Sequence, residues 1–486
     1  MYHVVKINIK PKHKLFGYCE AATTAAKNMY NVANFYIRNT MTGLSKDPEK
    51  LTDNEKEVLQ IVHDSILAHN EKAAKRREAG KKAALFDLPT QENWFLNYYM
   101  LNAIFKESDN VDYRAHHAHL VQSAIQSCAE AWRSYFELKK QYGVNPDAFR
   151  GEPKIPHYIK TDHKTAELTN IACKVKEGFL CFPKCKQKLN VSKLPHAEDK
   201  LVEVRIVPYC GIYQVQIVTD DGAEESVLIE SSAEIPEGTG VAVLDPGVRN
   251  FATIADNKGN SPIIIKGGVL MAANQWYNKQ MAKLRGIQMK GKDPNTFHPP
   301  TTKQMSAISR KRDALLSDTF YKMAHFIFRT MEERKLQVLI VGRNKEWKQE
   351  VNIGHVNNQT FVGIPHARFL FILQTVSIQY DIVVLEQEES YTSKASFLDR
   401  DPMPAVHDES CNTVFSGRRV KRGLYRSASG VCLNADVNGA MNIGRKCDER
   451  LFPADQDYSY LTQSIVVCRF EDLNPSAKQE TQVQVS

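Results

Sequence analysis

Hydrophobic and polar residues follow three different patterns along the chain. In the first ten residues they alternate, which predicts one β-strand. From Cys19 the apolar residues recur at helical spacing, and a second long helical pattern covers residues 118–142. Residues 160–235 return to a period of two and are interrupted by Gly, Pro and Asp, which predicts short antiparallel strands. A strand, then helices, then strands together predict a small β-barrel that is interrupted by a helical insertion.

The third pattern begins near residue 238. Its first strand, residues 241–244, is wholly apolar and runs into Asp245 and a Pro-Gly turn. Two short strands follow, then a pair of helices, and then two more buried strands that are separated by a helix. The last helix opens at Asp436. Strands and helices in this order predict the α/β sheet of the ribonuclease H-like fold.

Length and composition limit the class of protein. The 486 residues correspond to roughly three domains, and a hydrophobic fraction of 42% is typical of chains with folded cores. The net charge of +8 favours a polyanionic partner. Ten cysteines without a repeated CxxC spacing indicate free thiols in a reducing compartment. The chain carries neither a signal-peptide pattern nor the ~20-residue apolar run of a membrane helix, so we expect an intracellular, cytoplasmic protein without a membrane partner.

Carboxylates stand at three places where predicted buried elements begin or end. Asp245 terminates an apolar strand, although a turn-forming aspartate before Pro-Gly would give the same pattern. Asp436 opens the last helix, where an ordinary N-cap is the alternative. A third strand runs into Glu386, Glu388 and Glu389, which by themselves are typical of a solvated strand end. Because a two-metal nuclease needs carboxylates that converge on its divalent cations, these acids are candidate metal ligands for phosphodiester hydrolysis.

Four segments together resemble the RuvC nuclease motifs of the transposon-encoded TnpB proteins and of the related miniature type V CRISPR effectors. The close resemblance covers Gly238 to Lys446, and a looser one extends into the N-terminal half. It implies a RuvC nuclease domain at 237–389 and 436–450, which cleaves DNA with two Mg²⁺ ions. The family's first and last aspartates fall on Asp245 and Asp436. The four segments are LDPGVRNFAT, NKEWKQEVNIGHVNNQTFVGIPHARFLFILQ, EESYTSKASFLDRD and ADVNGAMNIGRK.

The middle glutamate of the family is not in its usual place. It normally ends the strand that is written LIVG here, so Gly342 occupies its position. A subgroup of the family carries this glutamate on the following strand, just ahead of a Tyr-Thr-Ser segment, and the match in this chain is Glu389. Because side chains alternate along a strand, only one of Glu388 and Glu389 can face the metals. The motif favours Glu389, with Glu388 as the alternate.

The chain also departs from the family in residues 390–435, which correspond to a target-nucleic-acid loop with a zinc finger. The paired cysteines of the family are replaced, and only Cys411 and Cys432 remain, with His407 as a conceivable third ligand. Two thiols without paired spacing do not make a four-ligand zinc site. We therefore expect no zinc in this degenerate zinc-finger region and a loop that is held by other contacts.

Basic and aromatic residues make up the predicted nucleic-acid contacts. Five cations crowd the 390–435 loop with no acid between them and would draw a phosphate backbone toward the acids, although a solvated surface is the ordinary role of such a run. Tyr and Phe at helical spacing are likewise more often core residues than stacking platforms. The predicted contacts are Arg418, Arg419, Lys421, Arg422 and Arg426 in the loop, Lys303 and Arg310 on the long helix of the third pattern, and Tyr30, Asn34 and Gln122 in the N-terminal half.

The resemblance also implies the remaining domain plan and the partners. A β-barrel wedge domain comprises 1–16 and 152–236, a helical recognition domain comprises 17–151, and the tail 451–486 is expected to be partly disordered. The partners are a guide RNA and double-stranded target DNA, and the protein acts in the cytoplasm, at the nucleoid of a prokaryote. Two alternatives stay open, a guided DNA-binding repressor without cleavage and a junction resolvase-like nuclease, and so does the oligomeric state.

Overall fold

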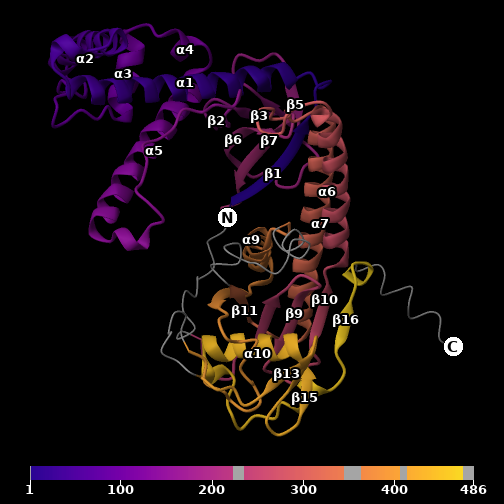
Figure 1. Cartoon of the computed structure of the whole chain (residues 1–486). Coiled ribbons are helices and arrows are strands. Elements are labelled where there is room, and N and C mark those ends of the chain that lie inside the picture. Colours follow the sequence, from indigo (N-terminus) through magenta and orange to yellow (C-terminus); the bar gives the residue numbers. More distant parts are fainter. Residues whose placement is uncertain (1, 223–234, 344–362, 405–412, 474–486) are drawn as a thin grey trace. The chain divides into compact units, whose positions relative to one another are not determined.

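A computed structural model describes residues 2–222, 235–343, 363–404 and 413–473 of the chain (Figure 1). The chain divides into two compact units, Met1–Glu224 and Glu225–Ser486. Within the four described ranges, no helix combines the length and the apolar character that crossing a membrane requires.

The first unit contains two antiparallel sheets. The larger has the strand order β1-β7-β6-β2, and the smaller has the order β3-β4-β5. The strands pair in these two sheets, and the small barrel that the sequence predicted for this part of the chain stays a prediction. Pairing of β1 with β7 joins the two ends of this unit's sequence. The strands are β1 (Tyr2–Ile9), β2 (Ala166–Thr169), β3 (Lys174–Lys176), β4 (Phe179–Cys181), β5 (Lys188–Asn190), β6 (Lys200–Tyr209) and β7 (Ile212–Asp220).

The helices of the first unit all lie between β1 and β2 in the sequence. Alanines and other small residues on one face of α1 let α5 approach closely, and the fully buried Trp132 of α5 donates from its indole nitrogen to Asn34 Oδ1 at 2.9 Å. The pairing satisfies both buried polar groups, so it joins the two long helices without an unpaired donor. The helices are α1 (Phe16–Leu44), α2 (Asp53–Glu78), α3 (Tyr98–Glu107), α4 (Val111–Arg114) and α5 (Ala118–Val144).

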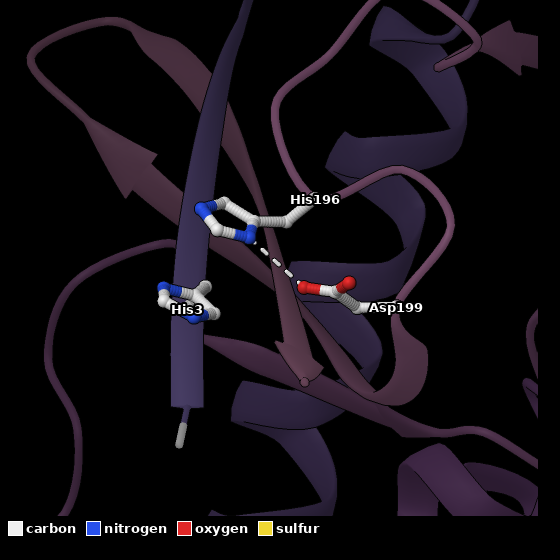
Figure 2. A group of neighbouring side chains, drawn as sticks. All are labelled: His3, His196 and Asp199. Carbon is white, nitrogen blue, oxygen red and sulfur yellow. Dashed lines mark hydrogen bonds and ion pairs between the residues drawn. The ribbon is translucent and has the colours of Figure 1, made fainter. Parts of the chain in front are cut away.

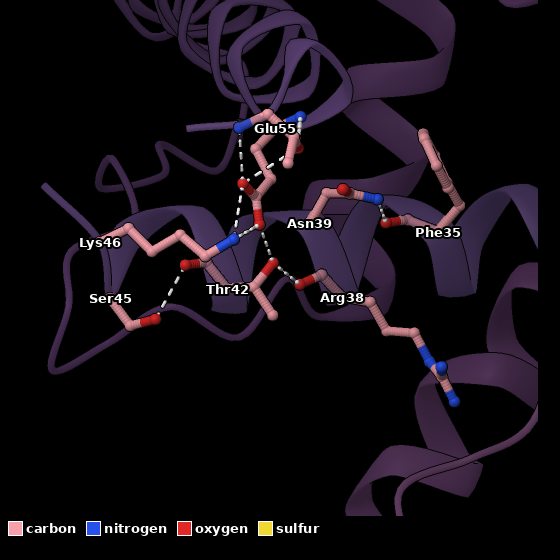
Figure 3. A network of polar contacts seen from close by, with 8 residues as sticks. Phe35, Arg38, Asn39, Thr42, Ser45, Lys46 and Glu55 are labelled. Carbon is pink, nitrogen blue, oxygen red and sulfur yellow. Dashed lines mark hydrogen bonds and ion pairs between the residues drawn. The ribbon is translucent and has the colours of Figure 1, made fainter. Parts of the chain in front are cut away.

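A buried carboxylate joins α1 to α2 (Figure 3). Glu55 forms a capping box with Thr52 at the start of α2, and it also accepts hydrogen bonds from Thr42 Oγ1 at 2.7 Å and Lys46 Nζ at 2.6 Å near the end of α1. The hydrogen bonds from Lys46, Thr42 and the Thr52 backbone lower the pKa of Glu55 to about 2. The side chain therefore stays ionised throughout the neutral pH range and joins the end of α1 to the start of α2.

The second unit is built on a six-stranded mixed sheet in the order β12-β11-β8-β9-β10-β16. Strands β8, β9 and β10 are antiparallel neighbours, and β11 and β12 run parallel to β8. This is the ribonuclease H-like arrangement that the order of elements predicted. The strands are β8 (Val241–Pro246), β9 (Asn250–Asp256), β10 (Ile263–Lys266), β11 (Val338–Arg343), β12 (Val383–Glu388) and β16 (Val466–Cys468).

Helices cover both faces of this sheet. Because side chains alternate along β8, Ala242 and Leu244 pack in a core with α7 and α9, whereas Val241 and Val243 pack in another with α10. Helices α6 and α7 run side by side (Figure 1). A small three-stranded sheet, β13-β14-β15, precedes α10. The bounds are α6 (Gly268–Met289), α7 (Lys303–Glu333), α9 (His366–Ser377), β13 (Arg418–Lys421), β14 (Leu424–Arg426), β15 (Cys432–Asn434) and α10 (Ala435–Cys447).

The C-terminal segment, residues 451–486, is predicted from the sequence to be partly disordered. Within its described part, Leu451, Phe452 and Tyr460 are buried against α10 and the sheet, and β16 pairs with β10. The segment has no regular period because it is mostly irregular chain with short 3₁₀ turns, so its buried residues follow no helical or strand spacing. Residues beyond Leu473 lie outside the described part of the chain.

Candidate active site

Asp245 lies at the carboxyl end of β8, where the sheet's core ends. The four preceding residues are fully buried, so packing in the core fixes the strand that carries Asp245. The loss of hydrating water at this position, together with the negative charges of Glu389 and Asp436, raises the pKa of Asp245, and Arg419 acts in the opposite direction. The three carboxylates are therefore close enough to perturb one another.

Asp436 lies in the first turn of α10 but is not its N-cap. Asn434 is the cap, because its side chain accepts from the backbone nitrogens of Asp436 at 2.9 Å and Val437 at 3.3 Å. The carboxylate of Asp436 is directed elsewhere: it accepts from Asn250 Nδ2 at 2.7 Å and from Arg419 Nη2 at 3.2 Å. The structure therefore rejects the capping alternative that the sequence left open.

Two adjacent glutamates at the end of β12 have different surroundings. Glu388 receives hydrogen bonds from Lys446 Nζ at 2.6 Å and from the Ser390 backbone. Partial burial acts to raise its pKa, but these hydrogen bonds outweigh burial and lower the pKa of Glu388. Glu389 follows the strand and lies beside Gly342 and Asp245. The structure thus brings Glu389 to the acidic cluster and ties Glu388 to the end of α10.

The missing side chain of Gly342 leaves the space that Glu389 occupies. A Cβ atom at residue 342 would lie 2.9 Å from Glu389 Oε2 and 2.7 Å from Ile443 Cδ1. Gly439 has the same relation to Asp245, since a Cβ there would lie 2.9 Å from Asp245 Oδ2. Both distances are shorter than ordinary carbon–oxygen contacts, so β11 and α10 approach the carboxylates closely because they carry glycine at these positions.

Two asparagines of α10 hold the loop that follows Glu389. Asn438 and Asn442 are fully buried, and both donate to the carbonyl of Ala395 at 2.7 Å. Asn442 also donates to the Thr392 carbonyl at 3.0 Å, and Asn438 accepts from the Phe397 backbone at 3.0 Å. No role was predicted for these residues from the sequence, although their spacing of four residues places both on the same face of the helix.

A cavity of about 340 Å³ opens at the two aspartates, and its lining also includes Asn250, Arg419 and Arg422. Carboxylate oxygens are the ligands that Mg²⁺ prefers. The three carboxyl groups fit such an ion, because a divalent cation would offset both the burial of Asp245 and the negative charges of Glu389 and Asp436, which together raise the pKa of Asp245. Asp245, Glu389 and Asp436 are the residues that would hold it.

The predicted basic loop forms the β13-β14-β15 sheet beside this cavity. All five of its cations are exposed, and Arg418 lies opposite Arg426 across the β13-β14 pair. Only Arg419 and Arg422 line the cavity, while Lys421 and the Arg418–Arg426 pair extend the positive surface along the strands. On α7, Lys303 is exposed at the first position and Arg310 is half-buried two turns further on.

The structure places the predicted contacts of the N-terminal half mostly in the interior. Asn34 is fully buried between Trp132 and the Pro156 carbonyl, and Tyr30 is 8% exposed. Gln122 is half-buried and donates to Asn102 Oδ1 at 3.3 Å. Asn34 and Tyr30 thus lie in the interior of the first unit, and their contact with nucleic acid stays a prediction.

Carboxylates hold the loop for which the family uses zinc. Asp401 accepts from the backbone nitrogens of Ser396 at 2.8 Å and Ser416 at 3.0 Å. Asp399 accepts from Ser396 Oγ at 2.6 Å and from the Ala428 backbone at 2.7 Å. Cys432 is exposed. His407 and Cys411, the other conceivable ligands, lie outside the described residues.

Residues 224–348, which include Asp245 and Gly342, match the family model OrfB_IS605, described as a probable transposase. This match confirms the resemblance to the TnpB family. A comparison with curated proteins finds no match.

Solved structures give weaker likenesses. A Cas12f1 complex with single-guide RNA and target DNA is 12% identical, with a TM-score of 0.42 over 91% of this chain and 98% of that one. A Cas12f ternary complex is 12% identical, with a TM-score of 0.29 over 85% and 81%. C2c1 of Alicyclobacillus acidoterrestris with single-guide RNA is 11% identical, with a TM-score of 0.29 over 87% and 70%. These low scores add nothing to the argument from the site.

Proposed function

We propose that the protein is an RNA-guided DNA endonuclease that hydrolyses phosphodiester bonds of its target at one RuvC-type site. The observation that carries this proposal is the meeting of Asp245, Glu389 and Asp436, which come from the end of β8, the end of β12 and the start of α10. Asp245 and Asp436 line the same cavity, and the negative charges of Glu389 and Asp436 both act to raise the pKa of Asp245, as expected for acids that gather at a functional site.

The three carboxylates would hold Mg²⁺, with two ions expected from the family resemblance. Bound ions would activate the attacking water and stabilise the departing oxygen of the phosphodiester. The chain's own residues prepare the site for them. Asn250 orients Asp436 through its 2.7 Å hydrogen bond, and Lys266 Nζ fixes Asn250 in turn at 2.7 Å. Lys446 keeps Glu388 away from the cluster.

The basic β13-β14-β15 sheet would bring the phosphate backbone to the cavity. Arg419 and Arg422 stand at the acids themselves, and the exposed cations beyond them continue the positive surface. In the absence of substrate Arg419 pairs with Asp436 at 3.2 Å. A guanidinium binds a phosphate group through two parallel hydrogen bonds. Arg419 could therefore exchange its contact with Asp436 for a contact with the phosphate of the substrate, while Asp436 would bind the metal ions.

Guide RNA and double-stranded target DNA are the proposed partners. The confirmed likeness to TnpB and the net charge of +8 support this part of the proposal. The first unit would then contribute the wedge, at 1–16 and 152–236, and the recognition helices, at 17–151.

The decisive experiment combines cleavage with RNA recovery. RNA that copurifies with the full-length protein is extracted and sequenced, and the guide segment is used to design a target duplex. The wild-type complex should cleave this duplex in Mg²⁺. Asp245→Ala should lower the cleavage rate by more than about 100-fold, because losing a residue that binds the metal directly costs more than losing a residue that only orients a ligand. Glu386→Gln is the control, because Glu386 is a carboxylate of β12, three residues before Glu389, that pairs with Arg343 and Gln374.

Each outcome distinguishes between the functions. An unchanged cleavage rate in Asp245→Ala contradicts the nuclease site. RNA-directed binding without cleavage by the wild-type protein would identify the guided repressor. Recovery of no discrete RNA, together with cleavage of branched DNA, would identify the junction resolvase-like nuclease instead.

A further inference from the structure

A second group of metal-ligating side chains lies in the first unit, apart from the acidic cluster. His3 belongs to β1, His196 lies in the segment between β5 and β6, and Asp199 directly precedes β6. One ligand atom from each of the three lies within 4.8 Å of the other two. Figure 2 shows the two imidazole rings one above the other, with the Asp199 carboxylate directed toward His196. The sequence analysis did not single out these residues.

The two rings are stacked closely. Their centroids are 3.6 Å apart and their planes differ by 8°. The stacking brings the ring nitrogens of β1 and of the segment before β6 together; because the nitrogen lone pairs lie in the ring planes, one ring would turn about its side-chain bonds to share an ion with the other. Asp199 Oδ2 and His196 Nδ1 are hydrogen-bonded at 2.9 Å and would move slightly apart to become neighbouring ligands of a tetrahedral ion.

A further carboxylate supports this geometry. His3 Nε2 lies 2.8 Å from Asp221 Oδ2, just beyond the end of β7. A carboxylate that binds one ring nitrogen of a histidine fixes the ring and its tautomer, and it raises the basicity of the other nitrogen, an arrangement that is common around metal sites. His3 is therefore oriented from one side by Asp221 and stacked from the other side on His196.

The site is accessible and has room for an ion. The exposed fractions of the side chains are 22% for His3, 39% for His196 and 22% for Asp199. His196 and Asp199 also line a cavity of about 20 Å³, whose remaining walls are mainly aliphatic and include Leu194 and Ile217. That volume suffices for one water-sized group. A metal ion that these polar ligands bind at the edge of an apolar cavity would be only partly hydrated.

We propose that His3, His196 and Asp199 bind one divalent transition-metal ion of the class of Zn²⁺. Imidazole nitrogens with a carboxylate oxygen suit Zn²⁺ and not Mg²⁺, so this site and the acidic cluster take different metals. The ion would complete its tetrahedral shell with water. It would fasten the N-terminal strand β1 to the segment before β6 and so reinforce the edge of the larger sheet.

The test measures Zn²⁺ binding to the full-length protein. Zn²⁺ is titrated against a chromophoric competitor for the wild type, His3→Ala, His196→Ala and His63→Ala. His63 is the matched control, because it is an exposed histidine with an aspartate, Asp64, at 3.0 Å and without a second histidine. We expect each of the two site variants to bind one equivalent less than the wild type, or the same equivalent at least tenfold more weakly, and His63→Ala to bind as the wild type does. Comparison between variants separates this site from the free thiols, which all of them share.

A second measurement needs no variant and therefore survives a variant that fails to fold. The wild-type protein is treated with diethyl pyrocarbonate with and without Zn²⁺, and the modified histidines are identified by peptide mass mapping. Zn²⁺ should protect His3 and His196 and leave His63 reactive. Equal modification of all three with and without Zn²⁺, or wild-type stoichiometry in both site variants, would overturn the proposal. Neither readout depends on nuclease activity, so failure here is distinct from failure of the proposed function.

Discussion

At the scale of single residues, the position of the Glu389 side chain depends on the glycine at residue 342. The family places a glutamate where this chain has glycine, and the carboxylate that reaches the acidic cluster here comes from the neighbouring strand. The two changes are coupled by space, because a Cβ at residue 342 would lie 2.9 Å from Glu389 Oε2. The absence of a side chain at residue 342 therefore leaves room for Glu389, the proposed metal ligand.

Replacing Gly342 with alanine tests this coupling. The new methyl group must displace Glu389 or Ile443, so we expect a cost of about 1–3 kcal/mol in stability and a fall in single-turnover cleavage of about 10–100-fold, as for other disturbances of metal-ligand orientation. Gly286→Ala in α6 is the control, since nothing lies within 4 Å of a Cβ there. Cleavage by Gly342→Ala at the rate of Gly286→Ala would contradict the proposed fit.

At the scale of elements, the α1–α2 junction of the first unit depends on one ionised carboxylate. Glu55 caps α2 and pairs with the end of α1, and its side chain is almost wholly buried. The ion pair with Lys46 exists only while Glu55 is charged, and the Thr52 backbone nitrogen donates more strongly to a carboxylate than to a neutral carboxyl group.

The pH dependence of stability checks the role of Glu55. Its pKa is about 2 in the folded protein against an ordinary value of 4.5, so its contribution is complete above pH 4.5 and disappears as the pH falls toward 2. We expect Glu55→Gln to lower the free energy of unfolding at pH 7 by about 1–3 kcal/mol, with a smaller difference at pH 3. Urea unfolding followed by circular dichroism measures this, with the exposed Glu49→Gln as control. A difference that is independent of pH would refute the assignment.

At the scale of the whole chain, the last described segment completes the core of the second unit. The C-terminal residues return to the sheet as β16, and Phe452 packs on the α10 backbone at Gly444, where a Cβ would lie 2.5 Å from its ring. An irregular segment can stabilise a fold as much as a helix does when its few large side chains are fully buried.

Phe452→Ala should therefore destabilise the second unit strongly. Loss of a fully buried phenylalanine costs about 3–5 kcal/mol, which is a large part of the stability of a domain. Phe371→Ala is the matched control, because Phe371 is 66% exposed on α9 of the same unit. Thermal unfolding and limited proteolysis should detect the difference. Similar stability of the two variants would show that the segment contributes little to the core.

Prediction from the sequence succeeded best for helices and strands whose apolar residues recur at a regular spacing. The apolar run before Asp245, the two later buried strands and the helix at Asp436 follow from periodicity, and together they indicate the order of elements in the second unit. Periodicity cannot tell a buried helical face from a binding face. Asn34 and Tyr30, for which the family resemblance implied contact with nucleic acid, are buried in this structure.

The sequence by itself determined which residues were candidates for the site, namely the acids at element ends, the glycine at 342 and the basic run beside them. Only the tertiary structure decided which candidates meet. Glu388 and Glu389 are equivalent in composition and adjacent in the chain, and the choice between them depends on Lys446 and on the space beside Gly342. The stacked pair of His3 and His196 likewise has no counterpart in the sequence, because β1 meets the segment before β6 only in the folded unit, and the separation of these residues along the chain carries no information about their distance in space.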